Sequence, residues 1–408
     1  MTTTRLVIFV ITYLLIAIQQ IPGIRINRPA ASLMGAVAMV VIGGLPPGEA
    51  YAAIDPNVIV FLLGVLLLTA YLDLGGFFEW TASLVIEHVH SARMLLAAIV
   101  AVAGLLSALF INDTICLVFT PILVMMLRSL ELRAAPFLLA LAFASNVGSA
   151  MTVTGNPQNM LIGVSSGISY ASFLTAMALP ALGGLLIVYL VIALAFRKDL
   201  SAKLRVSERS RGTMDRSLVI KALLLFAVAL IGWLAGYSLP GVAIAAGTVM
   251  IAIARRDAAE AFARVEWSLL LFFAALFVVM GGVRDLPLFQ DLTVRATSSL
   301  HGAPLHDAVL VSGVMTVLSN LVSNVPAVLL WLPVVPYAPN ERLVWLVIAM
   351  SSTFAGNLTV LGSMANLIVA ERASARGVVL RFVDFLRVGV PITILTLAWG
   401  IGALLLVR

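Results

Sequence analysis

Apolar runs long enough to cross a lipid bilayer recur along the whole chain, and this feature restricts the possible folds most strongly. The clearest runs cover residues 6–18, 58–72, 94–111, 179–196 and 269–283. A spanning helix needs about 20 mainly apolar residues, and a segment in lipid must satisfy its own backbone hydrogen bonds. Only 11% of the residues are charged, against about 25% in soluble domains. The sequence therefore predicts an all-α polytopic membrane protein with about 10–12 transmembrane helices.

Several functional classes are disfavoured by the composition and by the motif content. The basic residues behind the net charge of +6 are not grouped with aromatic residues, so nucleic acid is not an expected partner. A single cysteine cannot form an internal disulfide. The sequence has no phosphate-binding loop, nucleophile elbow or zinc-protease motif. We expect no enzyme activity, no cofactor, no metal site and no ATP-driven transport within this chain.

The charge distribution predicts the domain organisation and the topology. Residues 197–216 form the only long polar stretch and hold seven of the 25 basic residues. Because positive charge collects in cytoplasmic loops, this stretch is predicted to be a cytoplasmic linker between membrane repeats 1–196 and 217–408. Arg25 and Arg28 are assigned to a second cytoplasmic loop. If each repeat crosses the membrane an odd number of times, the two repeats are inverted.

The two halves also align with each other residue by residue. The matching pairs are Phe61 with Phe272 and Pro180 with Pro391 at a shift of 211, Asn112 with Asn324 at 212, and Ser145 with Ser352 and Asn159 with Asn366 at 207. The shift drifts only slightly, as small differences in loop length would produce. Transporters are often built from such duplicated halves.

Two kinds of polar segment interrupt the apolar pattern at matching places in both halves. The first kind covers residues 107–114 and 319–326, and the second covers 145–159 and 351–366. They are rich in Asn, Ser, Thr and Gly, and Pro157 interrupts one of them, so they favour broken helices or re-entrant hairpins that line a cavity. The candidate residues for binding substrate or ion are Asn112, Asp113, Ser145, Asn146, Thr152, Gly155, Asn156, Asn159, Asn324, Ser352, Gly356, Asn357, Thr359 and Asn366.

Two alternatives stay open at this point. Small and hydroxyl residues also serve helix packing in membranes. Asp113, the one acid well inside an apolar stretch, is a candidate for proton or cation coupling because an intramembrane carboxylate is costly. It could instead cap the helix that starts near Thr114. Val325 takes its place in the second half, so a charge role would be asymmetric.

These segments resemble the ion transporter superfamily over nearly the whole chain. Asn112-Asp113-Thr114 with Pro121, and the 145–159 segment, look nearest to arsenite-efflux permeases, with sodium/proton antiporters and citrate permeases as relatives. The resemblance implies a scaffold part and an elevator-type transport part, two hairpins with the substrate site between their tips, and commonly a homodimer. Sodium-dicarboxylate members carry Ser-Asn-Thr at both tips, whereas this chain has Ser145-Asn146-Val147 and Ser352-Thr353.

These observations favour a secondary transporter of the bacterial or archaeal inner membrane that exports arsenite or antimonite by proton antiport. The predicted site holds neutral amides and no basic residue, which suits a neutral trihydroxide and an arsenical-resistance role. The first alternative is sodium- or proton-coupled transport of a carboxylate or another anion. The second is a channel or a non-transporting membrane scaffold. Some arsenite permeases also bind a separate ATPase subunit, so such a partner is an open expectation.

Overall fold

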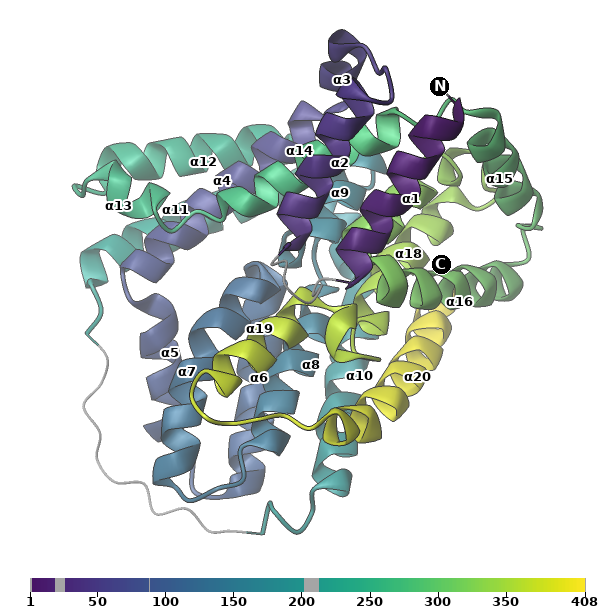
Figure 1. Ribbon diagram of the computed structural model, residues 1–408. Helices are drawn as coiled ribbons and strands as arrows, with labels where there is room; N and C mark the ends of the chain where they lie inside the picture. The colour runs from purple at the N-terminus through teal and green to yellow at the C-terminus, as the bar shows by residue number, and fades with distance from the viewer. Residues whose placement is uncertain (1, 19–25, 88, 202–212, 408) are drawn as a thin grey trace.

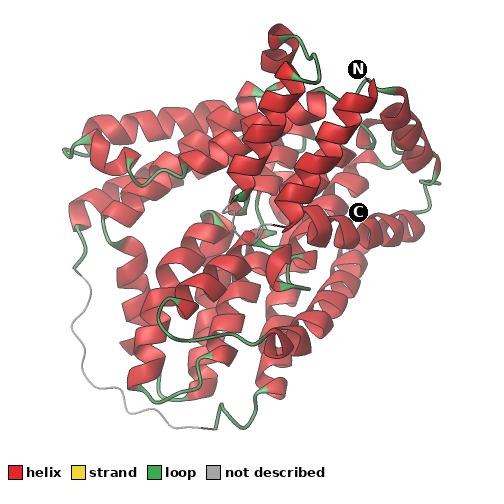
Figure 2. Cartoon of the chain, in the orientation of Figure 1, coloured by secondary structure: helices red, strands yellow, loops and turns green. Residues whose placement is uncertain are grey.

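The computed structural model describes residues 2–18, 26–87, 89–201 and 213–407, and within these ranges the chain consists of helices and loops (Figure 2). Seven helices in the described residues are long and apolar enough to span a membrane, and five shorter apolar helices accompany them. The long ones are α4 (Pro56–Leu74), α6 (Ala92–Leu109), α7 (Asn112–Ser129), α10 (Tyr170–Ala195), α11 (Arg216–Leu234), α16 (Pro304–Val322) and α20 (Phe382–Leu406). The short ones are α1 (Thr2–Ile18), α2 (Arg28–Val41), α8 (Ala135–Ser149), α12 (Leu239–Ile253) and α14 (Trp267–Gly281). The predicted all-α polytopic fold is confirmed.

The order of the elements repeats in the two halves. The helices α2, α3 (Pro47–Ala53) and α4 begin 211 residues before α12, α13 (Ala258–Phe262) and α14. The short helix η1 (Val153–Gly155) and α9 (Pro157–Ser165) begin 207 residues before η3 (Val360–Gly362) and α19 (Met364–Ser374). These are the shifts at which the two half-sequences align. Residues 202–212 of the predicted linker lie outside the described residues.

The two halves run in opposite directions, as the packing of α10 against its counterpart α20 shows (Figure 1). Arg133 forms ion pairs with Asp199, just after α10 ends, and with Asp384, in the first turn of α20, at 3.2 and 2.9 Å. Towards the opposite ends of the two helices, the indole Nε1 of Trp399 donates to the carbonyl oxygen of Leu179 at 3.1 Å. The end of one helix therefore lies beside the start of the other, which is the geometry of inverted repeats.

Helices of one half also pack directly against helices of the other half. Helix α2 packs against α14, and α4 packs against α12. Gly64 of α4 allows this approach, because a Cβ at this position would lie 2.6 Å from the backbone nitrogen of Ile244 in α12. Residues as far apart in sequence as Gly64 and Ile244, which are 180 positions apart, are thus brought together.

Both predicted kinds of interrupted segment are present. Helices α6 and α7 form a hairpin that turns at Phe110 and Ile111, and α16 joins α17 (Asn324–Trp331) in a turn at Ser323. The broken helices are α8–η1–α9 and α18 (Glu341–Ala355) with η3 and α19. Ser323 has φ 80° and ψ 161°, a conformation that is rare outside glycine and costs about 1–3 kcal/mol. Such strain is often concentrated at functional sites.

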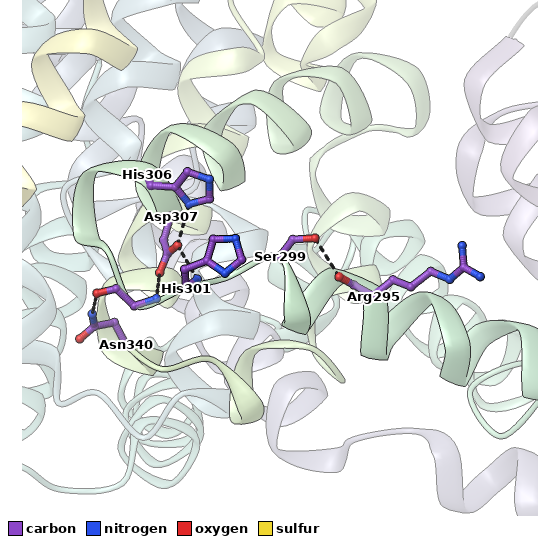
Figure 3. A network of polar contacts seen from close by, with 7 residues as sticks. Arg295, Ser299, His301, His306, Asp307 and Asn340 are labelled. Carbon is purple, nitrogen blue, oxygen red and sulfur yellow. Dashed lines mark hydrogen bonds and ion pairs between the residues drawn. The ribbon is translucent and has the colours of Figure 1, made fainter.

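The remaining elements are amphipathic or connecting. These are α5 (Phe77–Glu87), α15 (Pro287–Ser298) and the short helix η2 (Val335–Tyr337). The loop that follows α15 is held by the buried Asp307, whose carboxylate accepts the backbone N–H groups of His301 and Gly302 at 3.0 and 2.9 Å (Figure 3). His306 Nδ1 lies 3.1 Å from the same carboxylate. Asp307 therefore has a clear structural role at the start of α16.

Candidate functional site

Of the helices that the structure describes, six begin at one cavity of about 110 Å³. They are α2, α7 and α9 of the first half and α14, α17 and α19 of the second half. The first turn of a helix presents unpaired backbone N–H groups and carries about half a positive charge. At α2 and α9 one of these N–H groups is already capped, by the side chains of Asn27 and Asn156. The six helix starts together direct partial positive charge and backbone donors toward the cavity.

Three charged side chains line this cavity, and two of them were not predicted to belong to the site. Arg28 is 5% exposed and donates to the carbonyl oxygen of Leu361 at 2.9 Å. Arg28 is therefore a helix residue and not a loop residue, and the expectation that the site holds no basic residue was wrong. The reason is that α2 begins at Arg28 and packs into the second half. Arg25 lies outside the described residues.

The second unpredicted residue is Glu266, which lines the cavity at the start of α14. In the sequence, Glu266 is an acid directly before an apolar run. It also falls on Asp55 at the repeat shift of 211. Nothing in the local pattern distinguished it from an ordinary loop acid.

Asp113 is the third charged residue of the cavity, and it is half-buried there. It is the second residue of α7, whose N-cap is Ile111 with no side-chain cap hydrogen bond. The alternative that Asp113 caps this helix is therefore wrong. Its neighbours Asn112 and, from the second half, Asn324 also line the cavity, so three of the predicted residues meet there.

A second group of predicted residues forms a buried amide network around Asn146. The Asn146 side-chain nitrogen donates to the side-chain oxygens of Asn357 and Asn366 at 2.8 and 3.0 Å. Its oxygen accepts from Asn112 at 3.1 Å and from the Ser363 hydroxyl at 2.8 Å. The network thus joins both halves directly beside the cavity. Within the described residues Asn146 uses both atoms of its amide, whereas the side-chain oxygen of Asn112 and the side-chain nitrogen of Asn357 are buried without a partner.

Asn159 and Asn366 perform the same task in the two broken helices. The Asn159 amide donates to the carbonyl oxygen of Thr152 at 2.9 Å, and the Asn366 amide donates to that of Thr359 at 3.1 Å. Each amide also reaches a residue at the end of the preceding helix, Ser149 or Gly356. They therefore hold the two turns closed.

The pairing around these two asparagines differs between the halves. The oxygen of Asn366 accepts from Asn146, whereas within the described residues the buried oxygen of Asn159 has no hydrogen-bond partner. Thr353 stands at the position that corresponds to Asn146 and is too short to replace its amide. This unpartnered oxygen is a free acceptor in the first half of the site.

The other predicted residues support the segments. Ser145 bonds to Ser107 at 2.8 Å and donates to the Asn112 carbonyl at 3.1 Å. Further contacts are Asn156 with Ser149, Thr152 with the Ala108 carbonyl, Thr359 with Asn320, and Ser352 with the Ala349 carbonyl. Gly155 lies where a side chain would meet the backbone of Ser107 and Ser149. These contacts shape the turns beside the cavity.

Comparisons with known proteins agree with this architecture. The family model described as "Citrate transporter" (CitMHS) matches residues 13–350. The silicon efflux transporter LSI3 of Oryza sativa subsp. japonica is 30% identical over 467 residues, covering 97% of this chain and 96% of the relative. The putative transporter arsB of Dictyostelium discoideum is 24% identical over 496 residues, covering 94% and 88%. The crystal structure of the YdaH transporter of Alcanivorax borkumensis, described as having an unusual topology, matches with a TM-score of 0.59 and 15% identity over 98% of both chains.

Proposed function

The chain belongs to the CitMHS citrate transporter family and is a membrane transporter, and from this premise we propose that it exports small uncharged hydroxides, arsenite and antimonite first among them, in exchange for protons. The observation that carries the proposal is the cavity at the six helix starts, through its size and its mixture of donors and acceptors.

The size of the cavity favours a solute of very few atoms. Its volume is about 110 Å³. Pockets for larger organic ligands are usually about 300–1,000 Å³. Arsenite in its neutral form is a trihydroxide with four heavy atoms, which suits this space. A tricarboxylate would require the cavity to open considerably.

The chemistry of the lining favours hydroxyl groups over carboxylates. Helix starts, Asn side chains and Arg28 supply donors, while Asp113 and Glu266 supply acceptors. A hydroxyl can donate and accept, so a neutral hydroxide can use both kinds of group. An ionised carboxylate only accepts, and it would meet the two acids without a proton to share.

The relatives provide further support for this class of solute. Dissolved silicon near neutral pH is mainly an uncharged tetrahydroxide, and the rice relative is a silicon efflux transporter. The Dictyostelium relative carries the name of a putative arsB transporter. Both solute types present several hydroxyl groups on one small central atom, which fits the mixed lining of the cavity.

Asp113 is the proposed proton carrier, because it is an acid within an apolar span and faces the cavity. The test uses purified protein in proteoliposomes with an imposed pH gradient, then with a sodium gradient. We expect uphill arsenite movement that follows the proton gradient and falls to the level of empty liposomes in Asp113→Asn. Asp291→Asn, which changes an exposed acid of α15, is the matched control. Uphill transport that persists in Asp113→Asn, or that ignores the pH gradient, would contradict the proposal.

Carboxylate transport is the second candidate, and two specific observations favour it. The family is described by citrate, and the positive ends of six helices together with Arg28 would attract an anion. The same vesicles distinguish the candidates. Sodium-dependent citrate uptake without arsenite movement would show that the protein is a carboxylate transporter.

A further inference from the structure

Carboxylates at helix starts in this protein usually cap the helix that follows. Asp55, Asp215 and Asp257 are N-cap residues of α4, α11 and α13, and each accepts a backbone N–H of its own helix at 2.8, 3.1 and 2.9 Å. Such a cap stabilises a helix because it pairs a backbone N–H group that has no partner within the helix. These three acids therefore have a structural role.

Glu266 occupies the same position in α14 but does not cap it. The helix has no side-chain cap hydrogen bond, and within the described part of the chain the Glu266 carboxylate has no hydrogen-bond or ion-pair partner. It lines the cavity instead, with Arg28 and Asp113. A carboxylate that is held at a binding cavity without a structural task is a candidate for a role toward the solute.

The charges around the cavity indicate what that role is. With both acids ionised, Asp113 and Glu266 face the single positive side chain of Arg28, so the side chains of the cavity carry one net negative charge. The six helix starts contribute partial positive charge and would by themselves make an anion-binding site. An additional negative charge beside the solute opposes the entry of anions, because like charges repel most strongly at close range.

We propose that Glu266 is a specificity-determining residue that excludes small inorganic anions, so that the cavity accepts uncharged hydroxides. This inference rests on the proposed function and deepens it. Nitrate is a suitable probe, because it has four heavy atoms and three oxygens like arsenite but carries a permanent negative charge. The measured quantity is the ratio of nitrate entry to arsenite entry in proteoliposomes at neutral pH.

The comparison uses three variants with wild-type protein. We expect Glu266→Gln to raise the nitrate-to-arsenite ratio by about tenfold or more, since it removes one full charge beside the solute. Glu266→Asp keeps the charge and should still exclude nitrate. Asp55→Asn is the matched control from the first repeat, because it changes the equivalent N-cap, and Asn caps as well as Asp; its ratio should equal that of wild type.

Three results would overturn the inference. They are an unchanged ratio in a monodisperse Glu266→Gln variant, a rise of the same size in Glu266→Asp, or a rise of the same size in Asp55→Asn. If wild-type protein moves no arsenite at all, the proposed function fails. Nitrate entry in Glu266→Gln against Glu266→Asp then still decides whether this carboxylate excludes anions.

Discussion

The two broken helices share one design but differ in exposure. In the first half, residues 150–163 are all buried, whereas in the second half residues 358–361 are partly or fully exposed and Leu361 is 46% exposed. The first segment is therefore enclosed by protein, whereas part of the second segment lies at the surface of the protein. Both segments still contribute residues to the cavity, Pro157 and Gln158 from the first and Ser363 and Met364 from the second.

The contacts of the two segments explain the difference. Thr154 bonds to the Tyr170 hydroxyl at 3.2 Å, and the Tyr170 ring stacks on Trp233 at 5.5 Å between centroids. The corresponding residue of the second half is Leu361, whose backbone carbonyl oxygen accepts a hydrogen bond from the Arg28 side chain. Thr154 is thus packed against a pair of aromatic rings, whereas at Leu361 the backbone is held by a guanidinium group and the side chain is left exposed.

The largest expected difference is between Asn146 and Thr353, which occupy corresponding positions in the two halves. Asn146→Ala leaves several buried amide groups without partners, at about 1–3 kcal/mol each, so we expect a loss of about 3 kcal/mol or more in unfolding free energy and loss of arsenite flux. Thr353→Ala should cost only about 1 kcal/mol, because its contacts to Asn156 and Gln158 are long, at 3.4 and 3.2 Å. Denaturant unfolding in detergent measures both. Equal effects would show that the two positions are equivalent after all.

A smaller difference in stability is expected between alanine substitutions at Gly155 and Gly362, the corresponding glycines of the two turns. A methyl group on Gly155 would lie 2.8 Å from the Ser107 carbonyl oxygen and closer still to that of Ser149, both of which are backbone atoms. Overpacking of this kind costs about 1–3 kcal/mol, so Gly155→Ala should lower the thermal midpoint clearly. At Gly362 the nearest atoms are the side-chain oxygen of Asn320 at 2.5 Å and the backbone oxygen of Gly356 at 3.0 Å, so one side chain, held by Thr359, and only one backbone atom would have to shift. Gly362→Ala should therefore cost less than Gly155→Ala, at about 1 kcal/mol, and an equal or larger loss there would contradict the difference in packing.

The smallest effect concerns access to the two segments. Thr154 and Leu361 correspond at the shift of 207, and Thr154 is fully buried. Leu361→Cys should react with a membrane-impermeant maleimide at least about tenfold faster than Thr154→Cys, because a buried side chain reacts only during local opening. The native Cys116 is buried, so the wild-type chain provides the blank. Similar rates would mean that both segments are equally accessible in solution.

Much of the architecture could be predicted from local sequence patterns. Apolar runs of bilayer length predicted the helices, because lipid permits few other solutions for the backbone. The shifts of 207 and 211 predicted the repeat, and the paired Asn-rich segments predicted where helices break. The amide network around Asn146 joins residues that the pattern had already selected.

The charges of the cavity were decided only by the tertiary structure. Arg28 and Glu266 are 238 positions apart in the sequence, and they meet because α2 packs against α14 of the other half. Each residue alone resembles an ordinary charged group at the end of a helix. The sequence by itself therefore determined the helices, the duplication and the polar turns, since these depend on local patterns. The charge of the binding cavity depends on which helix starts converge, and that follows from packing between distant segments.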